Sequence, residues 1–204
     1  MPARTYRIET ARLVIRCYEP GDAELLWHAV NESLDHIRPW IPFARYEPTS
    51  LMEKKALVRK FRGEFDLGIN YVFGIFDKQN GDFLGGTGFH LRAGKDAAEI
   101  GYWIHVDQTG KGIATEAVQA LLQIAFCVER WNHIVIHCDP ENAGSARIAA
   151  KLGFRHTVTQ DTTAQDGSPQ DTMVWLLYRS EYEKMQGEKG SVRAFDFSGG
   201  LISY

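Results

Sequence analysis

The stretch AEIGYWIHVDQTGKGIATEAVQALLQ, residues Ala98–Gln123, is the most informative part of the sequence, because it joins a strand pattern to a helix pattern through two glycines. Its first part alternates and is rich in aromatic and β-branched residues, as strands are. In its last part the apolar residues recur at the spacing of a helix that packs on a sheet. Gly110 and Gly112 lie between the two parts. We predict a strand over 98–106, a glycine loop, and a helix over 115–129.

The sequence on either side of this stretch predicts further strands and helices. Ser50 and Glu53 form a capping box for one helix, and an Asn-Gly pair at Gly81 suits a hairpin turn. Asn142 is the N-cap of another helix, which ends at Gly153. The predicted elements, in order, are strand 12–18, a helix that includes 23–30, a helix from 50 that stops before 68, strands 71–76, 83–90 and 98–106, helix 115–129, strand 133–138, helix 142–152, and strands 154–159 and 173–178 around a polar loop at 160–171.

This order, β-α-α-β-β-β-α-β-α-β-β, is that of a mixed α/β (α+β) fold with a mostly antiparallel central sheet flanked by helices. The 204 residues suffice for one domain, which we expect over residues 1–185. The remaining residues, 186–204, are rich in Gly and Ser and lack periodicity, so we expect a loosely ordered C-terminal tail.

Composition narrows the class of protein. Hydrophobic residues at 44% and charged residues at 24% are typical of globular proteins. The net charge of −3 disfavours a nucleic-acid partner. Three cysteines without C-x-x-C spacing indicate a reduced, cytoplasmic protein. The sequence has neither an apolar stretch of transmembrane length nor an uncharged stretch near its start, so we expect neither a membrane span nor a signal peptide.

The glycine loop predicts a site for a diphosphate. Two glycines leave the backbone N–H groups uncovered, and a helix N-terminus adds unpaired donors with a partial positive charge. The alternative is that the glycines only shape a strand-to-helix turn. A Walker loop would place Lys after the second glycine, whereas Lys111 precedes it. A dinucleotide-binding loop would have a small third residue where Thr115 stands, and would lie within a parallel βαβ unit, whereas the strands predicted before this loop form an antiparallel meander.

The residues of this loop and three other segments resemble the GNAT superfamily of acetyl-CoA-dependent N-acetyltransferases, most closely its RimJ/RimL branch, which acts on ribosomal proteins. The family's phosphate loop, Arg or Gln followed by x-x-Gly-x-Gly or Ala, matches from Thr109, which departs from the usual first residue. The segments are AEIGYWI at 98–104, Asn142-x-x-Ser145 followed by KLGF at 151–154, and RPWIP at 38–42. The resemblance covers about residues 8–182.

The resemblance implies how acetyl-CoA would bind. The strand before the loop leaves backbone groups free for the pantetheine arm, which on this chain are those of Ile104, His105 and Val106. The thioester would then lie between this strand and the strand at 133–138. Asn142 and Ser145 would also contact coenzyme A. The diphosphate would be held by the loop residues Thr109, Gly110, Lys111, Gly112, Ile113, Ala114 and Thr115.

Direct attack on a thioester needs a neutral amine. An α-amine, with a pKa of about 7.7–8.0, is partly neutral near pH 7, whereas a lysine amine at about 10.4 is almost wholly charged. The resemblance makes Glu99 the candidate general base, acting through water. Strand alternation puts Gly101, Trp103 and His105 on the same side as Glu99. The alternatives are a solvated strand-end carboxylate and a carboxylate that binds the charge of the amine.

Ser145 is the candidate donor to the leaving thiolate. It stands at the third position of the helix that Asn142 caps, where the helix dipole favours negative charge. The alternative is that Ser145 is only a first-turn capping residue. Members of the ribosomal branch often follow KLGF with x-x-Glu-Gly, a glutamate proposed as their base. This chain has Thr157 and Val158 there, which puts a ribosomal-protein substrate in doubt.

The remaining candidates concern the acceptor and metals. Trp40, with Phe43 and Tyr46, either lines an acceptor pocket, as the resemblance suggests, or covers the edge of the core. His137, Cys138 and Asp139 are consecutive on or just after a strand. Neighbours there point to opposite faces, so we expect neither a nucleophilic dyad nor a metal site.

The sequence therefore predicts an acetyl-CoA-dependent enzyme that acetylates a primary amine, the N-terminal α-amine of a protein or peptide, without a covalent enzyme intermediate. Two alternatives stay open. One is acetylation of a small amine such as a polyamine, an amino acid or an aminoglycoside. The other is a sensor that binds acyl-CoA without turnover. The resemblance is also compatible with a homodimer.

Overall fold

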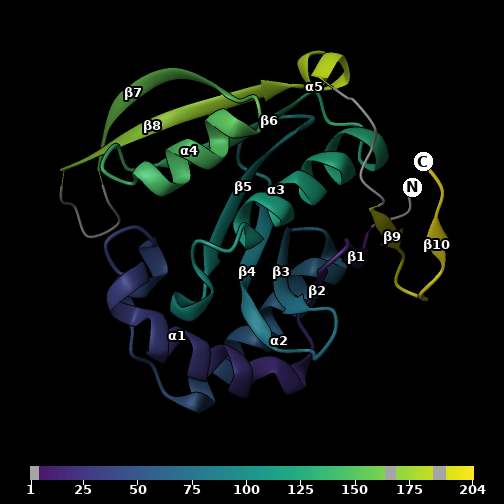
Figure 1. The fold of residues 1–204 in the computed structure, drawn as a ribbon. Helices are drawn as coiled ribbons and strands as arrows, with labels where there is room; N and C mark the ends of the chain where they lie inside the picture. Colours follow the sequence, from purple (N-terminus) through teal and green to yellow (C-terminus); the bar gives the residue numbers. More distant parts are fainter. Residues whose placement is uncertain (1–4, 164–168, 186–191) are drawn as a thin grey trace.

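The structure is a computed structural model that describes residues 5–163, 169–185 and 192–204 (Figure 1). Within these residues ten strands form a single sheet in the order β10-β9-β1-β2-β3-β4-β5-β6-β8-β7. The elements are β1 (Arg7–Glu9), β2 (Leu13–Cys17), η1 (Pro20–Asp22), α1 (Ala23–Ile37), η2 (Pro42–Tyr46), α2 (Leu51–Leu67), β3 (Asn70–Asp77), β4 (Phe83–His90), β5 (Ala97–Ile104), η3 (Val106–Gln108), α3 (Ile113–Gln123), η4 (Ile124–Val128), β6 (His133–Cys138), α4 (Ala143–Lys151), β7 (Arg155–Thr163), β8 (Pro169–Tyr178), α5 (Arg179–Met185), β9 (Arg193–Phe195) and β10 (Leu201–Ile202).

The sheet is antiparallel except for one pair. β5 and β6 run parallel because α3 crosses over between them, whereas every other neighbouring pair is antiparallel. This confirms the predicted mixed fold with a mostly antiparallel sheet flanked by helices. The β3–β4–β5 meander ends directly before the glycine loop.

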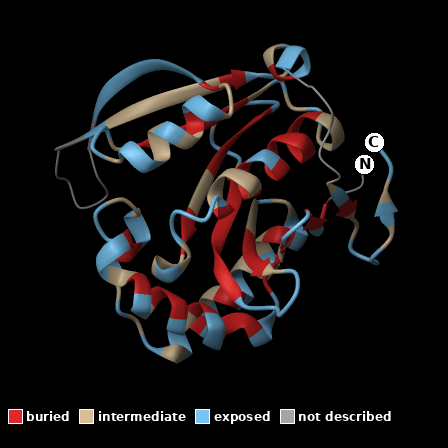
Figure 2. Cartoon of the chain, viewed as in Figure 1, coloured by how far each residue is buried: buried red, intermediate tan, exposed pale blue. Residues whose placement is uncertain are grey.

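Helices cover both faces of the sheet (Figure 1). On one face α1 packs through Leu26 and Val30 against Phe76 of β3 and Trp103 of β5. On the other face α3 buries an apolar stripe that includes Leu121. Figure 2 shows that the buried residues concentrate in the central strands and in α3. No helix in the described part of the chain is long and apolar enough to cross a bilayer.

Several elements begin or end where the sequence did not indicate. The helix predicted over 115–129 begins earlier, at Ile113, because Gly112 is its N-cap, and it ends as a π-helix, η4. Of the loop predicted at 160–171, the described residues 160–163 and 169–171 are strand, since β7 and β8 continue into it as backbone pairs such as Asp161 with Asp171. Residues 164–168 of this loop lie outside the described part. Polar segments of this kind show no apolar alternation in the sequence, which is why the pattern missed them.

The C-terminal prediction was wrong for the residues that the structure describes. β9 pairs with β1, and β10 pairs with β9, so the chain end extends the sheet. Ala194 of β9 and Ile8 of β1 are fully buried. Strands of two or three residues have no readable periodicity, and their pairing partner lies at the other end of the chain. Residues 186–191 of the predicted tail lie outside the described part.

Candidate functional site

The glycine loop, residues Gln108–Thr115, exposes its backbone at two points. Gly110 and Gly112 have φ of 73° and 78°, left-handed values that cost a residue with a Cβ about 1–2 kcal/mol. A Cβ built on Gly110 would meet no atom within 4 Å. An outside group can therefore approach the backbone closely, as a diphosphate cradle requires.

The first turn of α3 supplies further donors at the same place. The first helical hydrogen bond runs from the N–H of Glu116 to the carbonyl of Gly112, at 3.0 Å. The N–H groups of Ile113, Ala114 and Thr115 precede this bond, so no carbonyl of the helix accepts them. A helix start of this kind favours an anion, and these are the residues predicted to hold the diphosphate.

The polar side chains of the loop are used within the protein. The hydroxyl of Thr109 donates to the carbonyl that begins η3, at 2.9 Å, and the ammonium of Lys111 donates to the amide oxygen of Gln108, at 2.9 Å. Arg12, at the start of β2, donates to the carbonyl of Lys111 at 3.1 Å and pairs with Glu116 at 2.7 Å. A guanidinium group therefore stands beside the loop, its charge shared with a carboxylate.

β5 and β6 pair only over their first residues. The last pair is Glu99 with Val135, after which β5 continues to Ile104 and β6 to Cys138 without pairing with each other. We call the point just beyond the Glu99–Val135 pair the fork. From the fork onward, one edge of each strand is open, as the resemblance led us to expect for the pantetheine arm.

The open edge of β5 offers one of the three predicted arm-binding residues. The N–H of His105 still follows the ladder with β4 and donates to Leu84 at 2.9 Å, and the N–H of Val106 donates to the hydroxyl of Ser33 at 3.1 Å. Since backbone groups alternate along a strand, those of Ile104 point the other way, toward the open edge. The N–H groups of His105 and Val106 therefore already donate hydrogen bonds within the protein.

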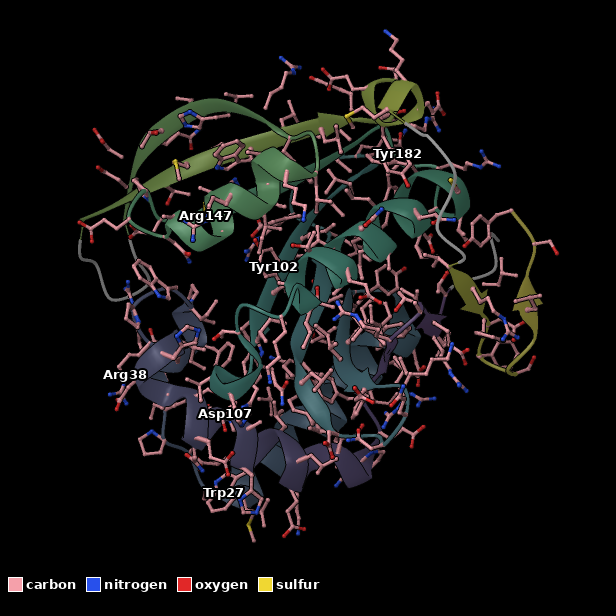
Figure 3. All side chains as sticks on the ribbon, in the orientation of Figure 1. Trp27, Arg38, Tyr102, Asp107, Arg147 and Tyr182 are labelled. Atoms are coloured by element: carbon pink, nitrogen blue, oxygen red, sulfur yellow. The ribbon has the colours of Figure 1, made fainter. Side chains whose placement is uncertain are left out.

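A pair of hydroxyl groups lies on the α4 side of the fork. Asn142 caps α4 by accepting the N–H of Ser145 at 3.0 Å. The Ser145 hydroxyl lies 2.8 Å from that of Tyr102 on β5, which Figure 3 labels beside α4. Burial raises the pKa of Tyr102 to about 12, although the bond to Ser145 acts against this. Both groups keep their protons near neutral pH and can donate them.

Glu99 is a buried carboxylate with two partners. Arg92 binds both of its oxygens, at 2.6 and 2.7 Å, and Nδ1 of His137 lies 3.0 Å from Oε2. Burial alone would raise the pKa of this carboxyl, but the hydrogen bonds and charges of Arg92 and His137 lower it to about 2. Glu99 is therefore ionised near neutral pH and a weak base. Its role as the proton acceptor stays a prediction.

The two groups of side chains stand on opposite faces of the sheet. Glu99 and Tyr102 are three residues apart on β5, and such residues point to opposite faces. Trp103, on the Glu99 side, packs with α1, so Glu99 and His137 are on the α1 side of the sheet, and Tyr102 and Ser145 are on the α4 side. The fork thus has a carboxylate–imidazole pair on one face and two hydroxyls on the other.

Trp40 lies in the turn after α1 and is half-buried. Its backbone N–H donates to the carbonyl of Ile37 at 3.0 Å. None of the hydrogen bonds and ring contacts in the described part of the chain joins it to Glu99 or Ser145. Its neighbour Phe43 contacts Trp103, with ring centroids 6.3 Å apart. The part of Trp40 in binding an acceptor stays a prediction.

Sequence reasoning missed three residues of the site. Tyr102 could have been found, because alternation places it with Ile104 on the face opposite Glu99. His137 was considered only with its neighbours Cys138 and Asp139, although the parallel β5–β6 pair brings it near Glu99. Arg92 lies in the turn after β4, and no sequence pattern indicated its contact with Glu99.

Comparison with known proteins gives a family that agrees with this geometry. The model of the acetyltransferase (GNAT) domain matches residues 12–155. The [ribosomal protein uS5]-alanine N-acetyltransferase of Escherichia coli is 26% identical over 177 residues, which cover 84% of this chain and 90% of that protein.

Solved structures share the fold. A GNAT acetyltransferase from Bacillus anthracis is 25% identical, with a TM-score of 0.74 over 86% of this chain and 99% of the other. RimJ of Mycobacterium smegmatis, solved in complex with CoA-disulfide, is 22% identical, with a TM-score of 0.76 over 91% of this chain and 92% of the other. With more than half of the chain matched by the family model, this protein belongs to the GNAT acetyltransferase family.

Proposed function

We propose that this protein transfers the acetyl group of acetyl-CoA to the N-terminal α-amine of a protein or peptide by direct attack. The observation that carries the proposal is the meeting of the glycine loop with the fork: backbone donors for a diphosphate begin where β5 and β6 have already parted. In this proposal the loop residues bind the diphosphate, and the open edge at Ile104 binds the pantetheine arm.

The donor side of the reaction suits the α4 face of the fork. Acetyl-CoA supplies the activated acyl group, and the side chains at the fork supply proton transfer. Tyr102 and Ser145 form a hydrogen-bonded pair whose hydroxyls can protonate the departing sulfur. Asn142 fixes the backbone of Ser145 by capping α4. A buried tyrosine bonded to a serine is a better proton donor here than a serine alone, since the serine can relay the proton.

An α-amine is the acceptor that the site's chemistry favours. It is partly neutral near pH 7, so a modest base suffices. Curated relatives of this chain include proteins named for the acetylation of an alanine of ribosomal protein uS5 and for a ribosomal-protein serine. Such an acceptor would place the reaction in the cytoplasm. A homodimer remains compatible with the proposal, and gel filtration would test it.

The test combines binding with turnover. Calorimetric titration with CoA measures the first half of the proposal, and release of the CoA thiol from acetyl-CoA measures the second. The acceptors are peptides that begin with Ala or Ser, the same peptides with a blocked N-terminus, and a panel of polyamines, amino acids and aminoglycosides. We expect CoA to bind and only the free N-terminal peptides to be acetylated.

Each of the other outcomes of this test would overturn a different part of the proposed function. Turnover with blocked peptides or with a small amine alone would remove the N-terminal acceptor and leave the transferase. Binding of CoA without turnover on any amine would favour the acyl-CoA sensor. Absence of heat with CoA would refute the whole proposal.

A further inference from the structure

The carboxylate–imidazole pair at the fork carries an inference about the proton acceptor. We infer that His137 is the general base that takes the proton from the attacking amine, directly or through one water, and that Glu99 is a positioning residue that acts through His137. This inference rests on the proposed function, because it assigns residues to the same reaction.

The hydrogen-bond network fixes which ring nitrogen can act. Arg92 binds both oxygens of Glu99, so the carboxylate is ionised and can only accept hydrogen bonds. Nδ1 of His137, 3.0 Å from Oε2, must therefore be the nitrogen that carries the hydrogen. In a neutral imidazole the lone pair is then on Nε2. Glu99 thus selects the tautomer in which Nε2 is the proton acceptor, as the carboxylate of a catalytic triad does.

Exposure separates the two members of the pair. The Glu99 side chain is 7% exposed, whereas that of His137 is 39% exposed. An incoming amine can therefore reach the imidazole more readily than the carboxylate. When Nε2 gains a proton, the ionised Glu99 stabilises the resulting imidazolium at once, because the two groups are already hydrogen-bonded.

The position of His137 fits the direction of the reaction. It lies two residues beyond Val135, the last β6 residue paired with β5, and so stands on the unpaired part of β6. It faces the α1 side of the sheet, opposite to Tyr102 and Ser145. Proton removal from the amine and proton donation to the sulfur would thus occur on opposite faces of the same opening.

The proton and electron balance is complete without another reagent. The amine nitrogen forms a bond to the acyl carbon and loses one proton to Nε2 of His137. The C–S bond breaks, its electron pair stays on sulfur, and the thiolate takes a proton from the Tyr102–Ser145 pair. His137 then releases its proton to water, and water restores the proton of the hydroxyl pair.

Few other ionisable groups surround the imidazole. Arg92 is bound to Glu99, and His90, opposite Glu99 in the β4–β5 register, has a pKa that burial lowers, with the charge of Arg92 adding to this. From β8 the residue opposite His137 is Val174, which carries no charge. Within the described contacts, Glu99 is the carboxylate that His137 contacts, at 3.0 Å.

The experiment is a pH–rate profile of the transferase reaction, measured with two peptides whose α-amines differ in pKa. Each limb of the profile is a pH range over which the rate changes. A limb whose midpoint pH differs between the two peptides reports the amine, and a limb whose midpoint pH is the same for both reports the enzyme. We expect wild type to show an enzyme limb on the acid side, because a protonated Nε2 cannot accept the proton of the amine. His137→Gln should lower kcat by about a hundredfold and abolish that limb.

Glu99→Gln supplies the second arm. Removal of the carboxylate deprives the imidazolium of its partner, so the acid limb should move to lower pH while kcat falls by about tenfold. A residue with a purely structural role would lower the rate without moving the limb. His133→Gln is the matched control, because His133 lies on the same face of β6 four residues away and its ring contacts Tyr178. It should retain the wild-type rate and limb.

The failures are distinguishable. Wild type without turnover on any amine would refute the proposed function. Suppose that wild type is active and that His137→Gln binds CoA normally, keeps kcat within threefold of wild type and retains the acid limb. This result would refute the role of His137 and leave the proposed transferase activity intact. If the limb survives in His137→Gln but vanishes in Glu99→Gln, the base is Glu99 itself.

Discussion

At the scale of single residues, the hydroxyl pair on the α4 side predicts a specific kinetic defect. Tyr102→Phe removes the phenolic oxygen but keeps the ring that packs in the core, and it leaves the cap between Asn142 and Ser145 in place. We expect kcat to fall by about tenfold or more, since the sulfur loses a proton donor, while the KM for acetyl-CoA changes less than threefold.

Thiol-release kinetics at saturating peptide would check this expectation, and Tyr71→Phe, on β3 of the same meander, serves as a tyrosine control away from the fork. An unchanged kcat in both Tyr102→Phe and Ser145→Ala would show that the thiolate leaves without help from this pair. A CoA thiolate is a good leaving group even without protonation. The double comparison therefore tests directly whether proton donation by Tyr102 and Ser145 contributes to the rate.

At the scale of elements, the glycine loop predicts a binding defect that backbone strain cannot explain. Gly110 and Gly81 have nearly the same φ, 73° and 79°, and a Cβ on either would meet no atom within 4 Å. Alanine at either position should therefore cost a similar 1–2 kcal/mol of stability, to order of magnitude. Only Gly110→Ala places a methyl group where the diphosphate is proposed to approach.

We expect the Kd for CoA to rise about tenfold, or about 1.4 kcal/mol, in Gly110→Ala and to stay unchanged in Gly81→Ala. Calorimetric titration of both variants, with urea unfolding to compare their stabilities, makes the measurement. Equal affinities in the two variants would mean that CoA does not contact the loop at Gly110.

The edge formed by β1, β9 and β10 carries another prediction at this scale. Ala194 is fully buried in β9, so Ala194→Glu would bring a charge without a partner into the sheet. We expect the free energy of unfolding to fall by about 2 kcal/mol or more. Ser203→Glu, exposed just beyond β10, should change it by less than about 0.5 kcal/mol.

Urea denaturation of the two variants measures the difference. If Ala194→Glu were as stable as Ser203→Glu, the C-terminal strands would not be part of the folded sheet in solution. The loss should leave the affinity for CoA unchanged, because this edge lies several strands away from β5 and β6.

At the scale of the whole molecule, the sequence predicted what local patterns encode and missed what distant pairing creates. The glycine loop, the cap at Asn142 and the strands around the meander could be predicted because turn residues and periodicity are local signals. The strand at β9 could not, since three residues carry no period and the partner strand lies at the opposite end of the chain.

The same division applies to the site. Ser145 and the loop residues follow from motif spacing, and the structure brings Ser145 to the fork. The partners of Glu99 depend on a turn after β4 and on the β5–β6 register, neither of which the sequence reveals. The pKa of Glu99 is set by those partners, so its chemistry was hidden until the fold was known.

The stability of the whole molecule should depend on pH through Glu99. Its pKa is about 2 in the folded protein and near 4.5 in the unfolded chain, so the folded state binds the proton more weakly. A carboxylate with a lowered pKa contributes stability that is present above the unfolded value and is lost as the pH falls toward the folded value. The contribution is about 3 kcal/mol at neutral pH and should decline between about pH 5 and pH 2.

Urea denaturation at pH 7 and at pH 3 would therefore show a larger loss of unfolding free energy for wild type than for Glu99→Gln, in which this group no longer titrates. Glu183→Gln, which removes an exposed carboxylate of α5 that lies 3.9 Å from Arg179, should behave as wild type does. Equal losses in all three proteins would mean that the ion pair of Arg92 with Glu99 does not stabilise the fold.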